Sequence, residues 1–366
     1  MFSDKALCCL LITVTCLMLA CAGCETAAPK ADQIQPQQQT VTTQAPKAPA
    51  PEVKPPETPP ALEKLPSQPP VTETVALKFN TGDSATYKVT TEAKQSVKWE
   101  GTVPQDFKGG TNHNRVEMTY NQQVQSVDEN GNAVLKITVE ALKYFSMRRD
   151  ELHMNFDSSN VKDPNDPLAL LIGQSYTIEM APTGEVTKVL EMTNAQKAVR
   201  RGSRVPRVAL RLLRPDTTKQ RHSIPFLPDA GNENLAVNDK WSKVRSFSFG
   251  LMGAKAYEKV YTLKKVDDSP DGKIANIKMN AIPSTEMAEE LHKQQEGENF
   301  SERFSSSNDS YNGHLKFNLT NGSIEEYSEE LLIEWLAVDS DPKTAAKEPT
   351  ALKMGVLRTY KLEKIK

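Results

Sequence analysis

Residues 75–366 alternate between apolar and polar side chains, and this period of two constrains the fold more than any other feature. Successive side chains of a β-strand point to opposite faces, so the alternation places one face on a core and the other in water. Pairs such as Asn130-Gly131 and Asp271-Gly272 separate the runs and supply the positive φ that tight hairpins need. We therefore predict a mainly β body built from antiparallel meanders. Clear alternating runs are Val116, Met118 and Tyr120; Leu135, Ile137 and Val139; Tyr176, Ile178 and Met180; and Leu331, Ile333 and Trp335.

Two parts of this body resemble each other at an offset of about 140 residues. We predict a duplicated meander, with halves 75–192 and 237–366 joined by a basic helical segment, 193–222. The two halves would form one curved sheet or split barrel with a few short helices, whose patterns fall chiefly at about 194–214 and 284–295. The alternative is that any two meanders share glycine turns. The correspondence pairs Gly131, Gly173 and Gly184 with Gly272, Gly313 and Gly322.

Residues 24–74 differ in composition from the body. They hold half of the chain's 24 prolines and no aromatic side chain. Such a stretch cannot bury enough apolar surface to offset the entropy lost on ordering. We predict a disordered, proline-rich tether that would reach about 150 Å when fully extended and about 40 Å as a flexible coil. A docking ligand of the PxxP type is the alternative.

The first 24 residues contain all five cysteines of the chain. The body therefore has no disulfide, no zinc–thiolate site and no cysteine nucleophile. Lys5 precedes the apolar segment 7–22, which is short for a membrane-spanning helix and typical of a signal peptide. We predict a signal peptide over 1–23.

The end of this signal, Cys21-Ala22-Gly23-Cys24, resembles the bacterial lipobox, in which small residues precede a cysteine that becomes lipid-modified after cleavage. The resemblance implies lipidation at Cys24, with Cys21 as the alternative site. An ordinary secretory signal is the alternative to both. Because two or three acyl chains hold a protein stably on a membrane, the mature chain would be anchored to a bilayer without spanning it.

The same resemblance implies export to the cell envelope, either on the periplasmic face or at the outer membrane. Glu25 follows Cys24, where many lipoproteins retained at the inner membrane have Asp, and this favours the outer membrane. The signal, the tether and the β body together resemble an uncharacterised family of β-rich bacterial lipoproteins. In the body the resemblance is carried by the hairpin 176–186, YTIEMAPTGEV. More remotely, the body is similar to half-barrels that carry lipoproteins or lipids across the periplasm, which implies an apolar concave face.

Residues 197–221 carry nine cations and one acid, Asp216, although the whole chain has a formal charge of only −2. Five arginines recur every three or four residues and would share one face of a helix, which Gly202 and Pro206 interrupt into two short helices or a kink. The segment either caps the sheet or contacts an anionic membrane or cell-wall glycan. Nucleic acid is not expected to meet an exported lipoprotein. The arginines are Arg200, Arg204, Arg207, Arg211 and Arg214.

Enzyme signatures are absent from the sequence. It contains no HExxH, GxSxG or GxxxxGK[ST] motif, so we expect no metal, no cofactor and no recognisable catalytic residue. Residues 267–272 begin like a calcium loop, but Lys278 stands at the twelfth position, so we predict a hairpin turn. The sequence favours a non-enzymatic envelope lipoprotein that binds an apolar ligand, such as a lipid, or another envelope component (a protein or a glycan). A cell-envelope hydrolase with an unrecognised site is the alternative.

Overall fold

The structure, a computed structural model, describes residues 71–101, 108–249, 252–286, 291, 306–338 and 351–365. Within these ranges the chain forms fourteen β-strands, three short α-helices and one 3-10 turn, which confirms the prediction of a mainly β fold. The residues from Thr72 onward belong to one compact unit. The expected signal peptide, both candidate lipidation sites, nearly all of the tether and most of the helical pattern at 284–295 lie outside the described residues.

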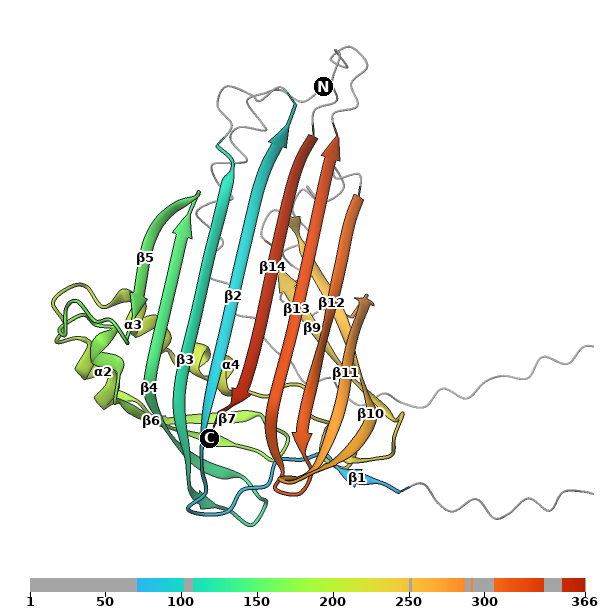
Figure 1. The fold of residues 1–366 in the computed structure, drawn as a ribbon. Helices are drawn as coiled ribbons and strands as arrows, with labels where there is room; N and C mark the ends of the chain where they lie inside the picture. Colours follow the sequence, from blue (N-terminus) through green and yellow to red (C-terminus); the bar gives the residue numbers. More distant parts are fainter. Residues whose placement is uncertain are drawn as a thin grey trace, which may run out of the picture. The chain divides into compact units, whose positions relative to one another are not determined.

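The first meander runs outward from the middle of a large antiparallel sheet (Figure 1). It consists of β2 (Ser84–Glu100), β3 (Gly110–Val127), β4 (Ala133–Arg148), β6 (Ser175–Met180) and β7 (Val186–Glu191). An additional strand, β5 (Glu151–Asp157), pairs with one end of β4, while β6 pairs with the other end. The long strands β2, β3 and β4 therefore carry most of this half.

The second meander returns from the opposite edge of the sheet toward the middle. It consists of β9 (Lys240–Ser248), β10 (Ala254–Ser269), β11 (Gly272–Ser284), β12 (Ser306–Asn318), β13 (Ser323–Val338) and β14 (Ala351–Lys364). The tight turn between β10 and β11 lies at Ser269–Gly272, so the calcium-like residues form the predicted hairpin.

The two meanders meet where β2 and β14 pair, along fourteen residues of each strand. The strand order is β7-β6-β4-β3-β2-β14-β13-β12-β11-β10-β9, and the sheet is curved but not closed into a barrel (Figure 1). Along this order, both the series from β7 to β2 and the series from β13 to β9 run from later to earlier strands of the chain, and β14 lies between them. The glycines that the sequence pairs do not all occupy matching places, because Gly313 lies inside β12 whereas its counterpart Gly173 precedes β6.

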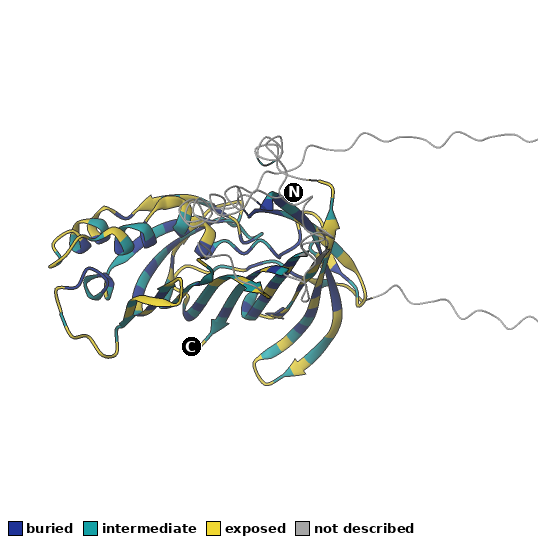
Figure 2. Cartoon of the chain, turned by 90° about the horizontal axis from the view of Figure 1, so that it is seen from above, coloured by how far each residue is buried: buried dark blue, intermediate teal, exposed yellow. Residues whose placement is uncertain are grey.

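The alternating residues of the sequence form one buried face of the sheet, which we call the inner face. In β4 the side chains of Leu135, Ile137 and Val139 are fully buried, whereas those of Lys136 and Thr138 between them are partly exposed. The same alternation produces the bands of buried and exposed residues along the strands in Figure 2. The hydrophobic core therefore lies against the inner face, and the opposite face is polar.

Three short helices connect the two meanders: α2 (Thr193–Val199), α3 (Arg207–Leu212) and α4 (Pro215–His222). The helical structure is interrupted between α2 and α3, at the place where Gly202 and Pro206 predict an interruption. Gly202 packs so closely on Pro167 that an added Cβ would lie 2.7 Å from the proline Cγ. α2 contacts β6 and α4 contacts β7, while α3 packs on both of these helices. Each of the three helices has buried residues.

The last residues of α4 and those that follow it cross the inner face from the first meander to the second, and we call Arg221–Leu227 the crossing segment. A two-stranded sheet of β1 (Glu73–Thr74) and β8 (Asn234–Leu235) then joins the start of the described chain to its middle. β1 lies within the last residues assigned to the tether. The crossing segment packs His222 on Tyr120 of β3, stacks Phe226 on Tyr327 of β13, and accepts a hydrogen bond from Trp241 of β9 at the Phe226 carbonyl.

Candidate functional site

The five arginines singled out in the sequence do not lie on one helix, because α2, α3 and α4 are separate. Arg204 pairs with Asp166, and the guanidinium of Arg211 donates a hydrogen bond to the Tyr144 hydroxyl over 2.6 Å. These two arginines therefore hold the helical segment on the first meander. The other three are exposed, with no side-chain ion pair among the described residues: Arg200 at the end of α2, Arg207 at the start of α3, and Arg214 just before α4.

A cavity of about 290 Å³ lies at the end of the sheet where the chain enters β2. We call it the base cavity. The residues before β2 help to close it: the Leu77 N–H donates to the Pro182 carbonyl (2.9 Å) and the Lys78 N–H to the Gly322 carbonyl (3.0 Å). Its volume is at the small end of the range found for ligand pockets. Its apolar lining includes Leu77, Phe79, Ala85, Tyr120, Val124, Met180, Ile224 and Leu362.

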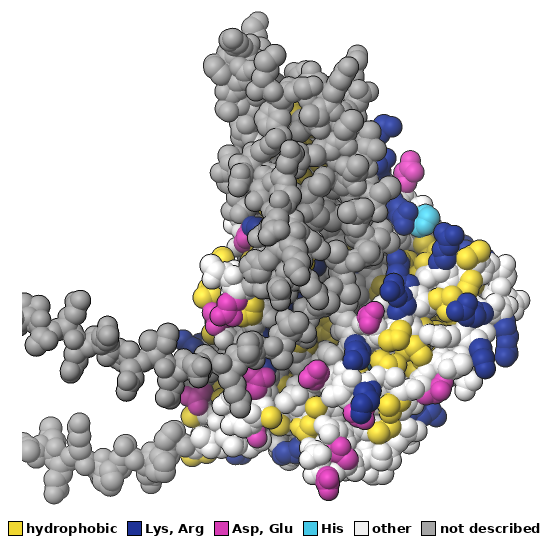
Figure 3. Space-filling view, turned by 180° about the vertical axis from the view of Figure 1, so that it is seen from behind, with side chains coloured by type: hydrophobic (Ala, Val, Ile, Leu, Met, Phe, Trp, Pro, Cys, Tyr) yellow, Lys and Arg dark blue, Asp and Glu magenta, His cyan; other side chains and the backbone are white. Residues whose placement is uncertain are grey.

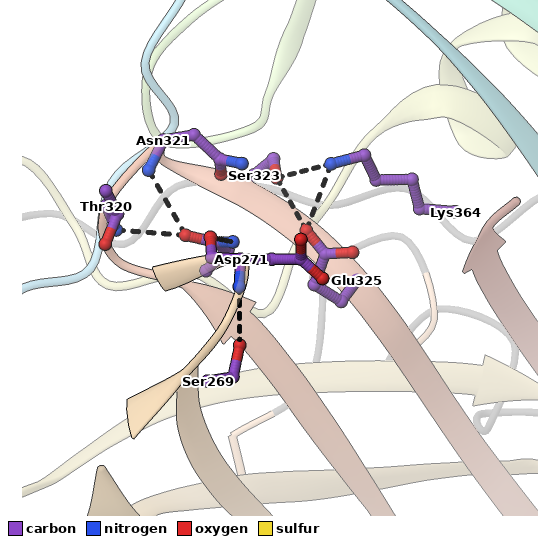
Figure 4. A network of polar contacts seen from close by, with 8 residues as sticks. Ser269, Asp271, Thr320, Asn321, Ser323, Glu325 and Lys364 are labelled. Atoms are coloured by element: carbon purple, nitrogen blue, oxygen red, sulfur yellow. Dashed lines mark hydrogen bonds and ion pairs between the residues drawn. The ribbon is translucent and has the colours of Figure 1, made fainter. Parts of the chain in front are cut away.

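One side of the cavity is formed by the turn between β12 and β13, which contains Thr320 and Asn321 (Figure 4). Asn318 fixes this turn. The Asn318 side chain is fully buried. Its Nδ2 donates to the Asp271 carbonyl (3.0 Å), and its Oδ1 accepts from the backbone N–H of Thr320 (3.1 Å) and Asn321 (3.2 Å). Two neighbouring hairpin turns are thereby tied together, and the cavity wall is held in place.

Polar side chains also line the cavity at Ser323 and Lys364, which point toward each other in Figure 4. The Lys364 ammonium donates to the Ser323 hydroxyl (3.2 Å) and to Oε1 of Glu325 (3.0 Å). Lys78, on the segment before β2, donates to the Leu319 carbonyl over 2.9 Å. The cavity thus combines an apolar lining with polar groups whose positions are fixed by hydrogen bonds.

His222 lines the cavity from the crossing segment and is 3% exposed. Its Nε2 lies 2.6 Å from the Tyr176 hydroxyl. Burial, reinforced by the nearby Arg221 charge, holds the pKa of His222 well below its usual range, while burial raises the pKa of Tyr176. Both groups are therefore neutral at pH 7.

Arg221 is buried beside His222 without a carboxylate partner among the described residues. One guanidinium nitrogen donates to the Leu212 carbonyl over 3.0 Å, at the last residue of α3. The carbonyl end of a helix carries partial negative charge, which favours a cation there. The second nitrogen, Nη1, has no hydrogen-bond partner in the described chain, nor do the neighbouring Thr218 hydroxyl and His222 Nδ1.

A cluster of charges and tyrosines lies on the inner face of the second meander, centred on Glu329 of β13. The carboxylate accepts from Arg245 at Oε1 (2.8 Å) and from Lys259 at Oε2 (2.9 Å). The hydroxyls of Tyr311 and Tyr327 also donate to Oε2, over 3.0 and 2.6 Å. Four strands, β9, β10, β12 and β13, thus meet at one carboxylate. We call this the Glu329 cluster.

The Glu329 cluster keeps its carboxylate ionised. Burial alone would raise the pKa of Glu329, but the charges of Lys259 and Arg245 and the hydrogen bonds from Tyr327 and Lys259 outweigh it and lower the pKa to about 2. Lys259 itself is 1% exposed. A second pair, Lys255 with Asp309 (2.6 Å), lies on the same face, and the Tyr257 hydroxyl donates to that carboxylate.

This cluster was not predicted from the sequence. In the sequence, Glu329 and Glu330 are adjacent acids of the kind that usually form a solvated strand face, but Glu329 is only 8% exposed. The available signal was its phase, since Glu329 is two residues from both Tyr327 and Leu331 and so belongs to the inward set. Glu330 points outward and is exposed, as expected.

In the described ranges, no three or more His, Cys, Asp or Glu side chains are grouped so that they would hold a metal ion. No described helix has the length and apolar character needed to cross a membrane.

No family model matches this sequence, and no curated protein is significantly similar to it. Among solved structures, a lipovitellin chain from a study of lipid–protein interactions aligns with 79% of this chain at 12% identity and a TM-score of 0.34. This chain spans about a quarter (26%) of that lipovitellin chain. DynF, from the dynemicin biosynthesis pathway of Micromonospora chersina, aligns over 85% of this chain and 94% of its own length, at 9% identity and a TM-score of 0.16. At these TM-scores neither likeness bears on what this chain binds.

Proposed function

We propose that the chain is a lipid-anchored protein of the bacterial cell envelope whose β body binds an apolar ligand in the base cavity. The observation that carries the ligand-binding proposal is the cavity itself. Its lining is largely apolar, its walls are tied by hydrogen bonds, and it lies between strands of the first meander and the turn that begins β13. Concave, mostly apolar cavities with a few fixed polar groups are the usual form of small-molecule sites in proteins.

The anchoring proposal is supported by the sequence Ala22-Gly23-Cys24 behind a short apolar segment. A body held close to a bilayer by acyl chains has direct access to membrane lipids and their breakdown products. The volume of the base cavity suits one acyl chain or a small apolar molecule better than a whole diacyl lipid. We therefore propose a single-chain apolar ligand.

Native mass spectrometry of the full mature chain, purified from the membranes of its native cells, tests both parts. We expect an N-terminal Cys24 carrying a diacylglyceryl group, and an additional bound species that dissociates on activation and has the mass of an acyl compound. An N-terminus at a residue other than Cys24 or Cys21 would contradict the anchor. Repeated recovery of the chain without any bound small molecule would contradict the proposed binding of an apolar ligand.

A further inference from the structure

The helical segment carries a concentration of charge opposite in sign to that of the chain as a whole. Residues 193–222 contain nine cations and one acid, whereas the formal charge of the full chain is −2. Cations gather on the side of the molecule where the helices lie, at the right of Figure 3. The charge is therefore strongly polarised toward one edge of the body.

Five of these cations are exposed and have neither an ion pair nor a side-chain hydrogen bond among the described residues, and we call them the basic patch. Lys219 is also exposed, but its ammonium donates a hydrogen bond to the Thr187 carbonyl, so it is not included. Arg204 and Arg211 are excluded from the patch because their partners, Asp166 and Tyr144, hold them on the first meander. The single acid of the segment, Asp216, is exposed in the first turn of α4. The basic patch consists of Lys197, Arg200, Arg201, Arg207 and Arg214.

The patch is displayed on a fixed support. Ala195 and Val199 of α2 and Ala209 and Leu212 of α3 are buried against the core, so the opposite sides of these helices face outward. Val205, in the connection between the helices, is 72% exposed. The surface thus combines several unpaired cations with a protruding aliphatic side chain, the composition found where proteins lie on anionic bilayers.

The shape of the patch indicates what kind of partner it fits. None of its five residues lines the base cavity. None lines a second hollow of the body either, a groove on the polar face of the sheet beside Lys88, Arg115 and Lys361. Exposed cations that do not converge on a cavity suit a surface of many negative groups rather than one small anion. Anionic headgroups of a bilayer provide such a surface, and their attraction for cations falls off within a Debye length.

We propose that the basic patch docks the β body on the anionic surface of a lipid bilayer. The inference rests on the proposed anchor only for proximity: the anchor keeps the body near a membrane, and the patch determines which edge of the body faces it. In this orientation the helical edge of the first meander lies against the headgroups.

Vesicle co-sedimentation of residues 24–366, produced without the signal peptide and with Cys24→Ser, tests the docking, because any binding then comes from the protein itself. We expect binding to vesicles of phosphatidylethanolamine and phosphatidylglycerol at 50 mM salt, little binding to phosphatidylcholine vesicles, and loss of binding at 500 mM salt. Arg200→Glu, Arg207→Glu and Arg214→Glu combined should weaken binding by at least about tenfold.

The matched control reverses the charge of three exposed lysines elsewhere and so changes the net charge by the same amount. The substitutions are Lys94→Glu, Lys98→Glu and Lys240→Glu. It should bind anionic vesicles within about twofold of the parent chain. Circular dichroism identifies any variant that fails to fold, and the single changes Arg207→Glu and Arg214→Glu then replace the triple variant. Equal binding of the arginine variant and the parent, equal weakening by both triple variants, or binding only to soluble anionic glycan would overturn the proposal.

The same arginine variant distinguishes this failure from failure of the proposed function. If the acylated form of the variant still carries its apolar ligand in native mass spectrometry but docks no differently from the parent, only the docking inference is wrong.

Discussion

Glu329 shows how a single residue organises the inner face of the second meander. Its carboxylate holds together side chains from four strands, and one missing partner would leave a buried charge unpaired. The residue opposite it in the register is Gly313, where an added Cβ would lie 2.3 Å from the Ser328 carbonyl oxygen. The cluster therefore depends on a small residue beside it as well as on its charged partners.

We predict that the stability of the body falls in acid through Glu329. Its pKa is lowered to about 2 in the folded state from an ordinary value of 4.5. A lowered folded pKa contributes stability that is complete above the unfolded value and is lost as the pH falls toward 2, here on the order of 3 kcal/mol. Urea unfolding between pH 5 and pH 2 should show this loss, and Glu329→Gln should be less stable at pH 7 with a flatter profile.

The outward neighbour provides the control for this experiment. Glu330→Gln changes the same side chain on the exposed face and should leave both the stability at pH 7 and its dependence on pH unchanged. A profile for Glu329→Gln as steep as that of the parent would show that other groups cause the acid sensitivity.

At the scale of single elements, the strands and turns follow from the sequence because their determinants are local. Alternation identified the inward residues of β3, β4, β6 and β13, and Asn-Gly and Asp-Gly pairs marked turns. The break between α2 and α3 was also predictable from Gly202 and Pro206. What local pattern did not contain is the partner of each strand, so the meeting of β2 with β14 and the place of β5 came only from the structure.

We predict that Gly184→Ala destabilises the body by about 2–4 kcal/mol. Gly184 has a φ of +83°, and an added Cβ would lie 2.6 Å from the Ile224 Cβ. The methyl group added to the turn before β7 would therefore push away the crossing segment, which lines the base cavity. Thermal or urea unfolding measures the change.

Gly231→Ala is the matched control for this turn. Gly231 has a similar φ of +88°, but no atom lies within 4 Å of the added Cβ. Gly231→Ala should lower the free energy of unfolding only by the backbone strain, about 1 kcal/mol. Equal losses for the two variants would show that contact with Ile224 is unimportant.

At the scale of the whole body, the two meanders are joined twice, by the β2–β14 pairing and by the crossing segment. Phe226 is fully buried, with its ring centroid 3.6 Å from that of Tyr327, and its carbonyl accepts from Trp241 over 3.0 Å. The sequence indicated a repeat but contained no signal for this crossing, since the packing of one phenylalanine against distant strands has no local pattern. The base cavity was missed for the same reason.

We predict that Phe226→Ala weakens both meanders together, by about 3–5 kcal/mol in unfolding free energy. Hydrogen exchange should show reduced protection in β3 and β4 as well as in β10 and β13, because the segment that Phe226 holds on Tyr327 of β13 also packs His222 on Tyr120 of β3. Loss of protection in one meander alone would mean that the halves unfold independently and that the crossing segment does not couple them.

The central claim is that the base cavity binds an apolar ligand, and a pair of substitutions on one strand tests it most directly. Ala85→Phe places a ring in the cavity, whereas Ala93→Phe makes the same change on the same strand at an exposed position that does not line it. Fluorescence titration of the full mature chain with cis-parinaric acid, a fluorescent fatty acid, gives the affinity. The account predicts saturable one-to-one binding to the parent and to Ala93→Phe, and at least about tenfold weaker binding to a folded Ala85→Phe, because filling the cavity removes the apolar contacts. Equal affinity for all three chains, or no saturable binding to the parent, would contradict it.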